Sequence, residues 1–462
     1  MNSESSSIAG KIPMQTISGW GRTQRVRSKV INVTSTLDSD HISPVLANSD
    51  GDHVISRGLG RSYGDAAQIA GGTVIILNDD INGSAIGADG ALRVSGGTSL
   101  DAIMKKYVPQ GYFVPVTPGT RYVTVGGAIA ADIHGKNHHV SGSFANHLHN
   151  LKLIAPQDSF DLSPTENPEI FWATVGGMGL TGVIANATVR MLPIETSYIS
   201  METRRAKDLD ELLAIMAGSD DDFRYSVAWI DCLSKGAAMG RGVLTRGDHT
   251  SLDALPKNKR TDPLKFKPNS RLVAPDWFPP HLLNPLSVRA FNEVWFRKAP
   301  RLRQGEVVPL STFFHPLDGV QGWNKIYGRY GFLQYQFVIP DGEEETLRKI
   351  MGKISNANVA SFLAVLKRFG ESNSGLLSFP KRGWTLALDI PIGSSTLSSL
   401  LDELDKDVLE ANGRLYLAKE SRASRETIRA MYPRLKEFAE IKARLDPKGI
   451  IVSDLSRRLC LT

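Results

Sequence analysis

The chain of 462 residues has little cysteine: Cys232 and Cys460 are its two cysteines. Two cysteines provide neither a disulfide framework nor a cysteine-ligated metal site. The N-terminal stretch lacks a basic start followed by an apolar run, so no secretory signal is predicted. An excess of one charge is nearly lacking too, since 54 basic and 48 acidic residues leave +6. This balance weakly favours phosphate-bearing or membrane-surface partners, and no nucleic-acid partner is predicted.

Long hydrophobic runs are lacking, with one stretch that needs inspection. Residues 170–189 carry no charge and are numerous enough to span a bilayer. They include Gly176, Gly177, Gly179 and Gly182 together with Asn186, which makes the stretch too polar and too flexible for a spanning helix. We therefore predict a buried strand–turn–strand and no transmembrane helix.

The sequence predicts an α+β protein with more than one domain, because 462 residues exceed the usual size of one. Residues 1–15 are polar and are expected to be disordered. Residues 16–192 combine glycine-rich loops with short β-prone runs at 73–77 and 114–116 and a helix after Ser99, which suits a cofactor-binding domain. The final segment, 413–462, is expected to pack back onto this domain.

Residues 193–412 have a different pattern, typical of an antiparallel sheet backed by helices. Strands are predicted at 225–230, 332–338, 361–369 and 384–390, and helices at 209–216, 347–354 and 397–408. An insertion at about 257–303 is expected to be irregular and mobile, as a lid or binding loop. Its residues 257–300 hold seven prolines, a basic run and large aromatics that include Trp277, Phe278, Phe291, Trp295 and Phe296.

Three glycine clusters mark places where the backbone must bend or approach a ligand closely. The first is RGLGRSYGD at 57–65. Its glycines let the backbone adopt conformations in which several N–H groups point at one anion. Its spacing is not that of the dinucleotide fingerprint. The others are PGTR with VGGAIAADIHG, within 118–135, and GGMGLTGVI at 176–184.

Together the clusters resemble the FAD-binding domain of vanillyl-alcohol-oxidase type flavoproteins. The resemblance implies a two-domain, PCMH-type FAD-binding fold with an antiparallel-sheet substrate domain. In many members a histidine before the serine of the first cluster is covalently joined to the flavin. Arg61 holds that position here, so the resemblance implies dissociable, non-covalent FAD.

Five histidines lie within 16 residues, which raises the question of a metal site. They are His134, His138, His139, His147 and His149. No cysteine accompanies them, and the surrounding Gly/Asn/Ser-rich sequence does not read as a helix that would align ligands four residues apart. We predict no metal and place His134 beside the flavin.

Two strands of the second region carry polar groups on one face. Gln334 and Gln336 are two residues apart and share a face, and Lys367 shares an otherwise apolar face with Val365 and Phe369. A lysine there is costly without a partner or ligand. Such donors suit hydroxyls and phosphate; the alternative is a lysine that snorkels at a sheet edge.

A sharper resemblance covers the chain from about residue 19 to the end. RGLGRSYGD, DIHGKNHH, FWATVGG, GFLQYQFVIP and GRLYLAKESR are similar to motifs of the decaprenylphosphoryl-β-D-ribose 2′-oxidase family. The resemblance implies FAD-dependent oxidation of the ribose 2′-hydroxyl of the polyprenylphosphoryl lipid to a ketone, within an epimerase that serves cell-wall arabinan synthesis. It also implies an NAD(P)H-dependent reductase partner and association with the membrane surface, on its periplasmic side.

The resemblance also assigns residues to the site. The implied flavin contacts are Ser56, Arg57, Gly58, Leu59, Gly60, Arg61, Ser62, Tyr63, Gly64, Asp65, Ala66, Gly119, Thr124, Val125, Gly126, Gly127, Ala131, Asp132, Ile133, His134, Ile184 and Tyr416. The implied substrate contacts are Tyr63, His134, Trp229, Gln334, Gln336, Lys367, Thr385, Ala387 and Lys419. Thr385 and Ala387 stand where the family often has asparagine and cysteine, so chemistry that needs a thiol there is in doubt. Phe313 and Phe314 lack the hydroxyl of a tyrosine.

The chemistry of alcohol oxidation suggests roles for these residues, since hydride leaves carbon and a proton leaves oxygen. We expect Lys419 to polarise the reacting hydroxyl or the flavin edge, Lys367 to serve the phosphate or a hydroxyl, and the two glutamines to orient the ribose. The proton acceptor stays open among Tyr63, His134 and Lys419. Two other functions stay open: a soluble sugar or alditol oxidase of the same fold, and a basic phosphate-binding or nucleic-acid-binding protein without redox activity.

Overall fold

A computed structural model describes residues 12–33, 42–47, 52–268, 272–275, 283–393 and 395–461. Most of the N-terminal stretch expected to be disordered, residues 1–11, lies outside them. Met14 and Gln15 are ordered, contrary to that expectation. They begin β1 (Met14–Ser18), whose antiparallel pairing with β2 (Arg25–Val33) places Met14 opposite Lys29.

The N-terminal part contains two sheets. In the first, the order is β1-β2-β4-β3, and β4 (Thr73–Leu77) pairs in parallel with β2 and with β3 (Val54–Arg57). The second is antiparallel, in the order β5 (Ala85–Ile86), β6 (Ala91–Ser95), β10 (Val183–Arg190), β8 (Leu148–Ile154) and β9 (Ser159–Leu162). The strand predicted at 73–77 is confirmed as β4. The one predicted at 114–116 is wrong, because the strand here, β7 (Tyr112–Phe113), ends before it and pairs with β11 (Leu192–Pro193).

Helices connect these sheets. The predicted helix after Ser99 is confirmed as α2 (Leu100–Tyr107), which Ser99 caps by accepting a hydrogen bond from Ala102 N–H. The expected strand–turn–strand at 170–189 is wrong in its first half, which belongs to the helix α5 (Pro168–Thr174). This helix begins with a proline, and its Phe171 is buried. Only β10 follows the expectation. No helix in the described part of the chain is both long and apolar enough to cross a membrane.

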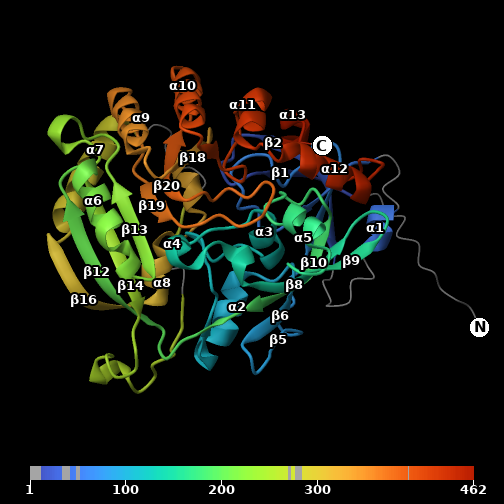
Figure 1. The fold of residues 1–462 in the computed structure, drawn as a ribbon, viewed down its shortest axis with the longest axis horizontal. Coiled ribbons are helices and arrows are strands. Elements are labelled where there is room, and N and C mark those ends of the chain that lie inside the picture. Colours follow the sequence, from blue (N-terminus) through green and yellow to red (C-terminus); the bar gives the residue numbers. More distant parts are fainter. Residues whose placement is uncertain are drawn as a thin grey trace, which may run out of the picture.

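The second part is built on an antiparallel sheet, as predicted (Figure 1). The sheet has eight strands, more than the four predicted. Three helices predicted from the sequence are confirmed: α6 (Leu209–Ser219), α9 (Glu344–Asn356) and α10 (Leu397–Glu410). Of these, α6 packs on β12 and β14, α10 packs on β18, and α9 packs on α10. The strand order is β16 (Leu302–Pro309), β12 (Tyr198–Ala206), β14 (Gly242–His249), β13 (Tyr225–Ile230), β19 (Ala364–Phe369), β20 (Gly383–Pro391), β18 (Phe332–Pro340) and β21 (Arg414–Leu415).

The insertion is more regular than expected. Residues 269–271 and 276–282 lie outside the described part, but α7 (Pro285–Lys298) is a helix where irregular chain was expected. Asn284 caps it, and its Asn292 Nδ2 donates to Asp231 Oδ1 at 2.7 Å. The cap and this hydrogen bond stabilise a helix that the composition of the insertion did not predict. The mobility of the insertion stays a prediction.

The C-terminal segment reaches both parts of the molecule. Its strand β21 closes the edge of the large sheet, so the proposed boundary near residue 413 falls at that edge. Its remainder, with α11 (Arg425–Met431), α12 (Leu435–Leu445) and α13 (Asp454–Leu459), lies against the N-terminal part (Figure 1). Val54 exchanges backbone hydrogen bonds with Ile450 and Val452, and Arg458 pairs with Asp65 and Glu420.

Candidate functional site

A cavity of about 1120 Å³ lies between the glycine-rich loops and one face of the large sheet. Because side chains two apart on a strand share a face, β12, β13, β14, β18 and β19 each present two alternate residues to it, and β20 presents Ala387. The predicted residues that line this cavity are Ser56, Arg57, Gly58, Leu59, Gly60, Arg61, Ser62, Tyr63, Ala66, Gly119, Thr124, Gly126, Gly127, Ala131, Ile133, His134, Trp229, Ile184, Gln334, Gln336, Lys367, Ala387, Tyr416 and Lys419.

Five predicted residues lie behind the lining instead. Asp65 accepts two hydrogen bonds from Arg458, and Asp132 accepts from Asn373 Nδ2 at 2.8 Å and from Ser378. Thr385 hydrogen-bonds to Gln336. Gly64 and Val125 complete the set; Val125 is buried in α3 (Val125–Ala130). These residues support lining residues from behind.

The loops fit the cofactor that the sequence implies. Gly119 and Gly127 expose backbone to the cavity, and the volume exceeds that of a typical small-ligand pocket, roughly 300–1,000 Å³. Close backbone approach also explains the glycines: a Cβ at Gly58 would lie 2.3 Å from Thr124 Oγ1. Such a cradle of bare backbone beside a large cavity suits a dinucleotide.

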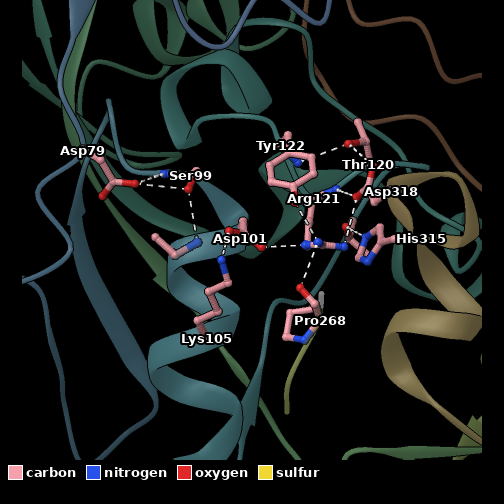
Figure 2. A network of polar contacts seen from close by, with 12 residues as sticks. Asp79, Ser99, Asp101, Lys105, Thr120, Arg121, Tyr122, Pro268, His315 and Asp318 are labelled. Carbon is pink, nitrogen blue, oxygen red and sulfur yellow. Dashed lines mark hydrogen bonds and ion pairs between the residues drawn. The ribbon is translucent and has the colours of Figure 1, made fainter. Parts of the chain in front are cut away.

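A buried arginine joins the second glycine loop to α2 and to Asp318 (Figure 2). Arg121 Nε donates to Asp101 Oδ1 on α2 at 2.5 Å, and its backbone N–H donates to Asp318 Oδ2 at 2.9 Å. Thr120 Oγ1 donates to the other oxygen of Asp318 at 2.7 Å, and Arg121 Nη2 donates to Pro268 O at 3.2 Å. The arginine thus ties a loop, a helix and the start of the insertion together.

His134 is held neutral within a chain of hydrogen bonds. The Thr385 hydroxyl donates to Phe337 O at 2.8 Å, so its oxygen accepts from Gln336 Nε2 at 3.3 Å. The same Nε2 donates to His134 Nε2 at 3.0 Å. Burial, with Lys367 next in effect, lowers the pKa of His134 well below its ordinary value. This nitrogen lone pair is therefore occupied in the structure.

Lysines supply the positive charge of the cavity. Lys367 Nζ lies 3.4 Å from His134 Nδ1, and burial lowers the Lys367 pKa to about 8. Lys136, which sequence reasoning missed, donates to Phe313 O and lies 4.2 Å from the centre of the Phe313 ring. Burial and then Lys367 lower the pKa of Lys136 to about 7.

A second polar group surrounds Lys419. Its Nζ lies 3.8 Å from the centre of the Tyr63 ring. Burial lowers the Lys419 pKa to about 7, against the opposing effect of Asp389. Gln334 Nε2 donates to Tyr63 Oη at 3.2 Å and to Asp389 Oδ1. Burial raises the pKa of Tyr63 well above its ordinary value, so Tyr63 is a neutral phenol at physiological pH.

Sequence reasoning missed Asp389, although the signal was present. The strand predicted at 384–390 alternates, with Thr385, Ala387 and Asp389 on one face and large apolar residues on the other. The aromatic Trp20 and the residues Gly96, Gly97 and Tyr122 also line the cavity. Trp20, Gly96 and Gly97 lie outside the quoted motifs, whereas Tyr122 directly follows PGTR.

Three other histidines of the cluster, His138, His139 and His147, hydrogen-bond to different parts of the chain. His138 Nδ1 accepts from Gly370 N–H at 3.2 Å, and His139 Nε2 donates to Phe223 O at 2.9 Å. His147 Nε2 donates to Ser141 O at 3.0 Å. Each is used in joining loops or elements.

If the glycine loops hold the flavin, Gly127→Val should abolish flavin binding, because a branched side chain would enter the cavity at a position where the backbone is bare. Its Cβ alone would lie 3.0 Å from Thr124 Oγ1. Flavin in the supernatant after acid precipitation measures the bound cofactor, which also tests the dissociable FAD expected with Arg61. Gly218→Val is the control, since a Cβ at Gly218 meets nothing within 4 Å. Stoichiometric flavin in Gly127→Val would contradict this role of the glycine loops, and flavin left in the wild-type pellet would contradict dissociable FAD.

Comparison with known proteins agrees with this geometry. A family profile described as FAD binding domain matches residues 43–159, and one described as D-arabinono-1,4-lactone oxidase matches residues 329–459. Cytokinin dehydrogenase 4 of Arabidopsis thaliana is 29% identical over 146 residues, which cover 30% of this chain and 28% of that protein. An uncharacterized protein of Streptomyces coelicolor is 40% identical over 373 residues, or 79% of this chain and 100% of that protein.

A more extensive match sets the family. Decaprenylphosphoryl-beta-D-ribose oxidase of Mycolicibacterium smegmatis is 45% identical over 450 residues, which cover 96% of this chain and 97% of that protein. The chain is therefore an FAD-dependent oxidoreductase with the two-domain PCMH-type fold. It belongs to the decaprenylphosphoryl-β-D-ribose oxidase family.

Proposed function

We propose that the protein oxidises the 2′-hydroxyl of decaprenylphosphoryl-β-D-ribofuranose to the 2′-ketone with FAD. The observation that carries this proposal is the 45% identity over 96% of the chain with a protein of that name. The cavity agrees with it, because cationic lysines suit a phosphate while amide groups suit sugar hydroxyls.

FAD, when bound, accepts the hydride that leaves the alcohol carbon. The protein must then accept the hydroxyl proton as the C–H and O–H bonds break and the carbonyl forms. Three residues were left open for this task. Tyr63 holds its own proton too tightly, and His134 Nε2 already accepts from Gln336.

Lys419 is the acceptor that the geometry favours. It lines the cavity, and its pKa of about 7 leaves a substantial neutral fraction at physiological pH. An acceptor is most effective when its pKa lies near the working pH. Its proposed role is thus proton uptake rather than polarisation by a fixed cation.

Other residues bind and orient the substrate. Gln334 and Gln336 lie side by side on the cavity face of β18 and can hydrogen-bond to the ribose hydroxyls. Lys367 and Lys136 form a basic wall that can bind the phosphate, whose negative charge favours their protonated forms. Trp229 Nε1 donates to Phe362 O at 3.0 Å, which fixes its ring as an apolar side of the same space.

The product and the lipid tail imply partners. A 2′-ketone becomes the epimeric arabinose lipid when a reductase delivers hydride from NAD(P)H to the opposite face. We propose such a reductase partner, and a role in the supply of arabinose for cell-wall arabinan. The polyprenyl tail stays in a bilayer, so we also propose that the protein works at the membrane surface, on the periplasmic side by family resemblance.

Helix α7 offers the membrane-facing surface. Leu286 and Val294 are 78% and 66% exposed, and Phe291 and Trp295 reach both solvent and the cavity. The opposite side of the helix is anchored through Asn292. Exposed apolar residues with flanking arginines and lysines suit an anionic lipid surface.

The proposed reaction predicts a specific spectral response. Purified protein should show a flavin spectrum, and decaprenylphosphoryl ribose added without oxygen should bleach it, because hydride reaches the flavin. A free polyol should leave it unchanged. Bleaching and peroxide formation with the polyol alone would instead identify a soluble sugar or alditol oxidase. A colourless protein would contradict redox function.

The role of Lys419 predicts a pH profile and two variants. Its neutral form is the acceptor, so kcat should rise through about pH 7 and level off above it. Lys419→Met and Lys419→Arg should both bind FAD and lose about 10²–10⁴-fold in rate. The arginine keeps the cation but cannot take up the proton, so substantial activity of Lys419→Arg would show that Lys419 acts as a fixed cation.

The α7 surface predicts the effect of charges placed on it. Leu286→Asp with Val294→Asp should reduce binding to anionic vesicles at least about tenfold, since two apolar side chains no longer enter the interface. Flavin content and turnover of a short-chain substrate should stay at the wild-type level. Val140→Asp is the control, because Val140 is 54% exposed on α4 (His138–Ser141) and does not line the cavity. Equal vesicle binding by all three proteins would exclude α7 as the membrane contact.

A further inference from the structure

Asp389 is a buried carboxylate beside the cavity that the mechanism above does not use. It has no solvent exposure, and it lies directly opposite Gln334 in the register of β18 and β20. A buried carboxylate is costly unless its partners repay the loss of water. Its partners should therefore reveal what it does.

The first partner is the Gln334 amide. An ionised carboxylate only accepts hydrogen bonds, so the amide must turn its NH2 end toward Asp389. Nε2 donates there and to Tyr63 Oη. Since Gln334 lines the cavity, this orientation leaves Oε1 as the end that can accept a hydrogen bond from a substrate hydroxyl.

The second partner is the charge of Lys419. Burial raises the pKa of Asp389 to about 7, although Gln334, Lys419 and Tyr327 each lower it. In turn, Asp389 raises the pKa of Lys419. The other titratable groups that act on this pair are Tyr63, Tyr327 and Lys367. Both tyrosines are neutral because burial raises their pKa values, and Lys367 repels the charge of Lys419. Asp389 thus opposes the burial and the repulsion that disfavour charged Lys419.

We propose that Asp389 is a positioning residue for the oxidation: it pins the Gln334 amide with its oxygen toward the reacting hydroxyl, and it provides the counter-charge when Lys419 takes up the proton. This inference rests on the proposed function of Lys419. It adds that the strand opposite Gln334 determines both the direction of one hydrogen bond and the basicity of the acceptor.

The variant Asp389→Asn separates the two effects. Asparagine can present either its oxygen or its NH2 group to Gln334, so the amide loses its bias. Its side chain carries no charge, so the pKa of Lys419 falls and the neutral amine persists to lower pH. We expect a loss of about 10- to 100-fold in kcat/KM. The acid limb of the pH profile should move down by about one unit.

The strand offers a matched control on its other face. Tyr335 donates to Asp405 Oδ1 at 3.0 Å, so it also joins β18 to a buried carboxylate, but away from the large cavity. Tyr335→Phe should lose stability without a change in the acid limb. Tyr327→Phe removes a 3.4 Å hydrogen bond to Asp389 Oδ2 that favours the ionised form. It should move the acid limb in the same direction as Asp389→Asn, by less.

The experiment measures flavin content, kcat, KM and the pH profile for the flavin-loaded wild type and the three variants. A second readout, independent of turnover, is the pH dependence of acetic anhydride labelling of Lys419, read by mass spectrometry. Lys419 in Asp389→Asn should become reactive at lower pH than in the wild type. If the wild type oxidises only a free polyol, the proposed substrate is wrong, and the same comparison made with that polyol still tests Asp389.

A flavin-loaded Asp389→Asn with the wild-type acid limb and the wild-type labelling curve overturns the proposal. So does an equal shift in Tyr335→Phe, because any buried carboxylate contact would then have the same effect. If Asp389→Asn does not fold or load flavin, Tyr327→Phe decides: a labelling curve that moves to lower pH supports the proposal, and an unmoved curve overturns it.

Discussion

The buried Arg121 guanidinium shapes the cavity because it connects segments that the sequence places far apart. It joins Asp101 on α2 with Asp318, which lies about 200 residues later, and it reaches Pro268 O at the start of the insertion. Its side chain is 2% exposed, as is that of Asp318. Removing one member of such a network leaves uncompensated buried charge, which costs roughly 3–5 kcal/mol. The glycine loop and the segment facing it are therefore held at a fixed separation.

The lysines of the site are buried away from water. Lys136, Lys367 and Lys419 all have lowered pKa values, and in each case burial is the main cause. Desolvated amines attract an anionic ligand strongly and give up or take up protons near neutral pH. One set of residues can thus bind a phosphate and receive a proton, provided that each lysine faces a different part of the ligand.

The register of β18 and β20 sorts these roles along the cavity. Gln334 lies opposite Asp389, and Gln336 lies opposite Ala387. Gln334 is pinned by a carboxylate, whereas Gln336 is pinned by the Thr385 hydroxyl and by His134. The two amides are chemically identical, but their surroundings differ. Gln334 belongs to the polar group around Lys419, and Gln336 belongs to the group around His134 and Lys367. Ala387, in the cavity lining, and Thr385, behind it, stand where the family often has cysteine and asparagine.

Local pattern in the sequence determined much of the architecture. The alternation at 225–230 and 332–338 and the helical spacing after Ser99 are confirmed because they depend on neighbours a few residues away. The glycine clusters likewise indicated the cradle, since only their residue type permits the close backbone approach. Residues 170–174 were misread because a short apolar run is compatible with a helix or a strand until packing decides.

Tertiary structure alone decided the chemistry of the side chains. The sequence named Tyr63, His134 and Lys419 as proton acceptors without ranking them, because a pKa depends on burial and on neighbours distant in the chain. Folding buries Tyr63 as a neutral phenol, occupies His134 Nε2 and brings the Lys419 pKa to about 7. The sequence shows Asp389 only as an acidic residue on a predicted strand. The pairing of β18 with β20 places Gln334 opposite it. The sequence determined which groups are present and on which strand face they lie. The tertiary contacts determined which groups hold a proton, which orient a partner and which can accept a proton, because desolvation and charge act through space.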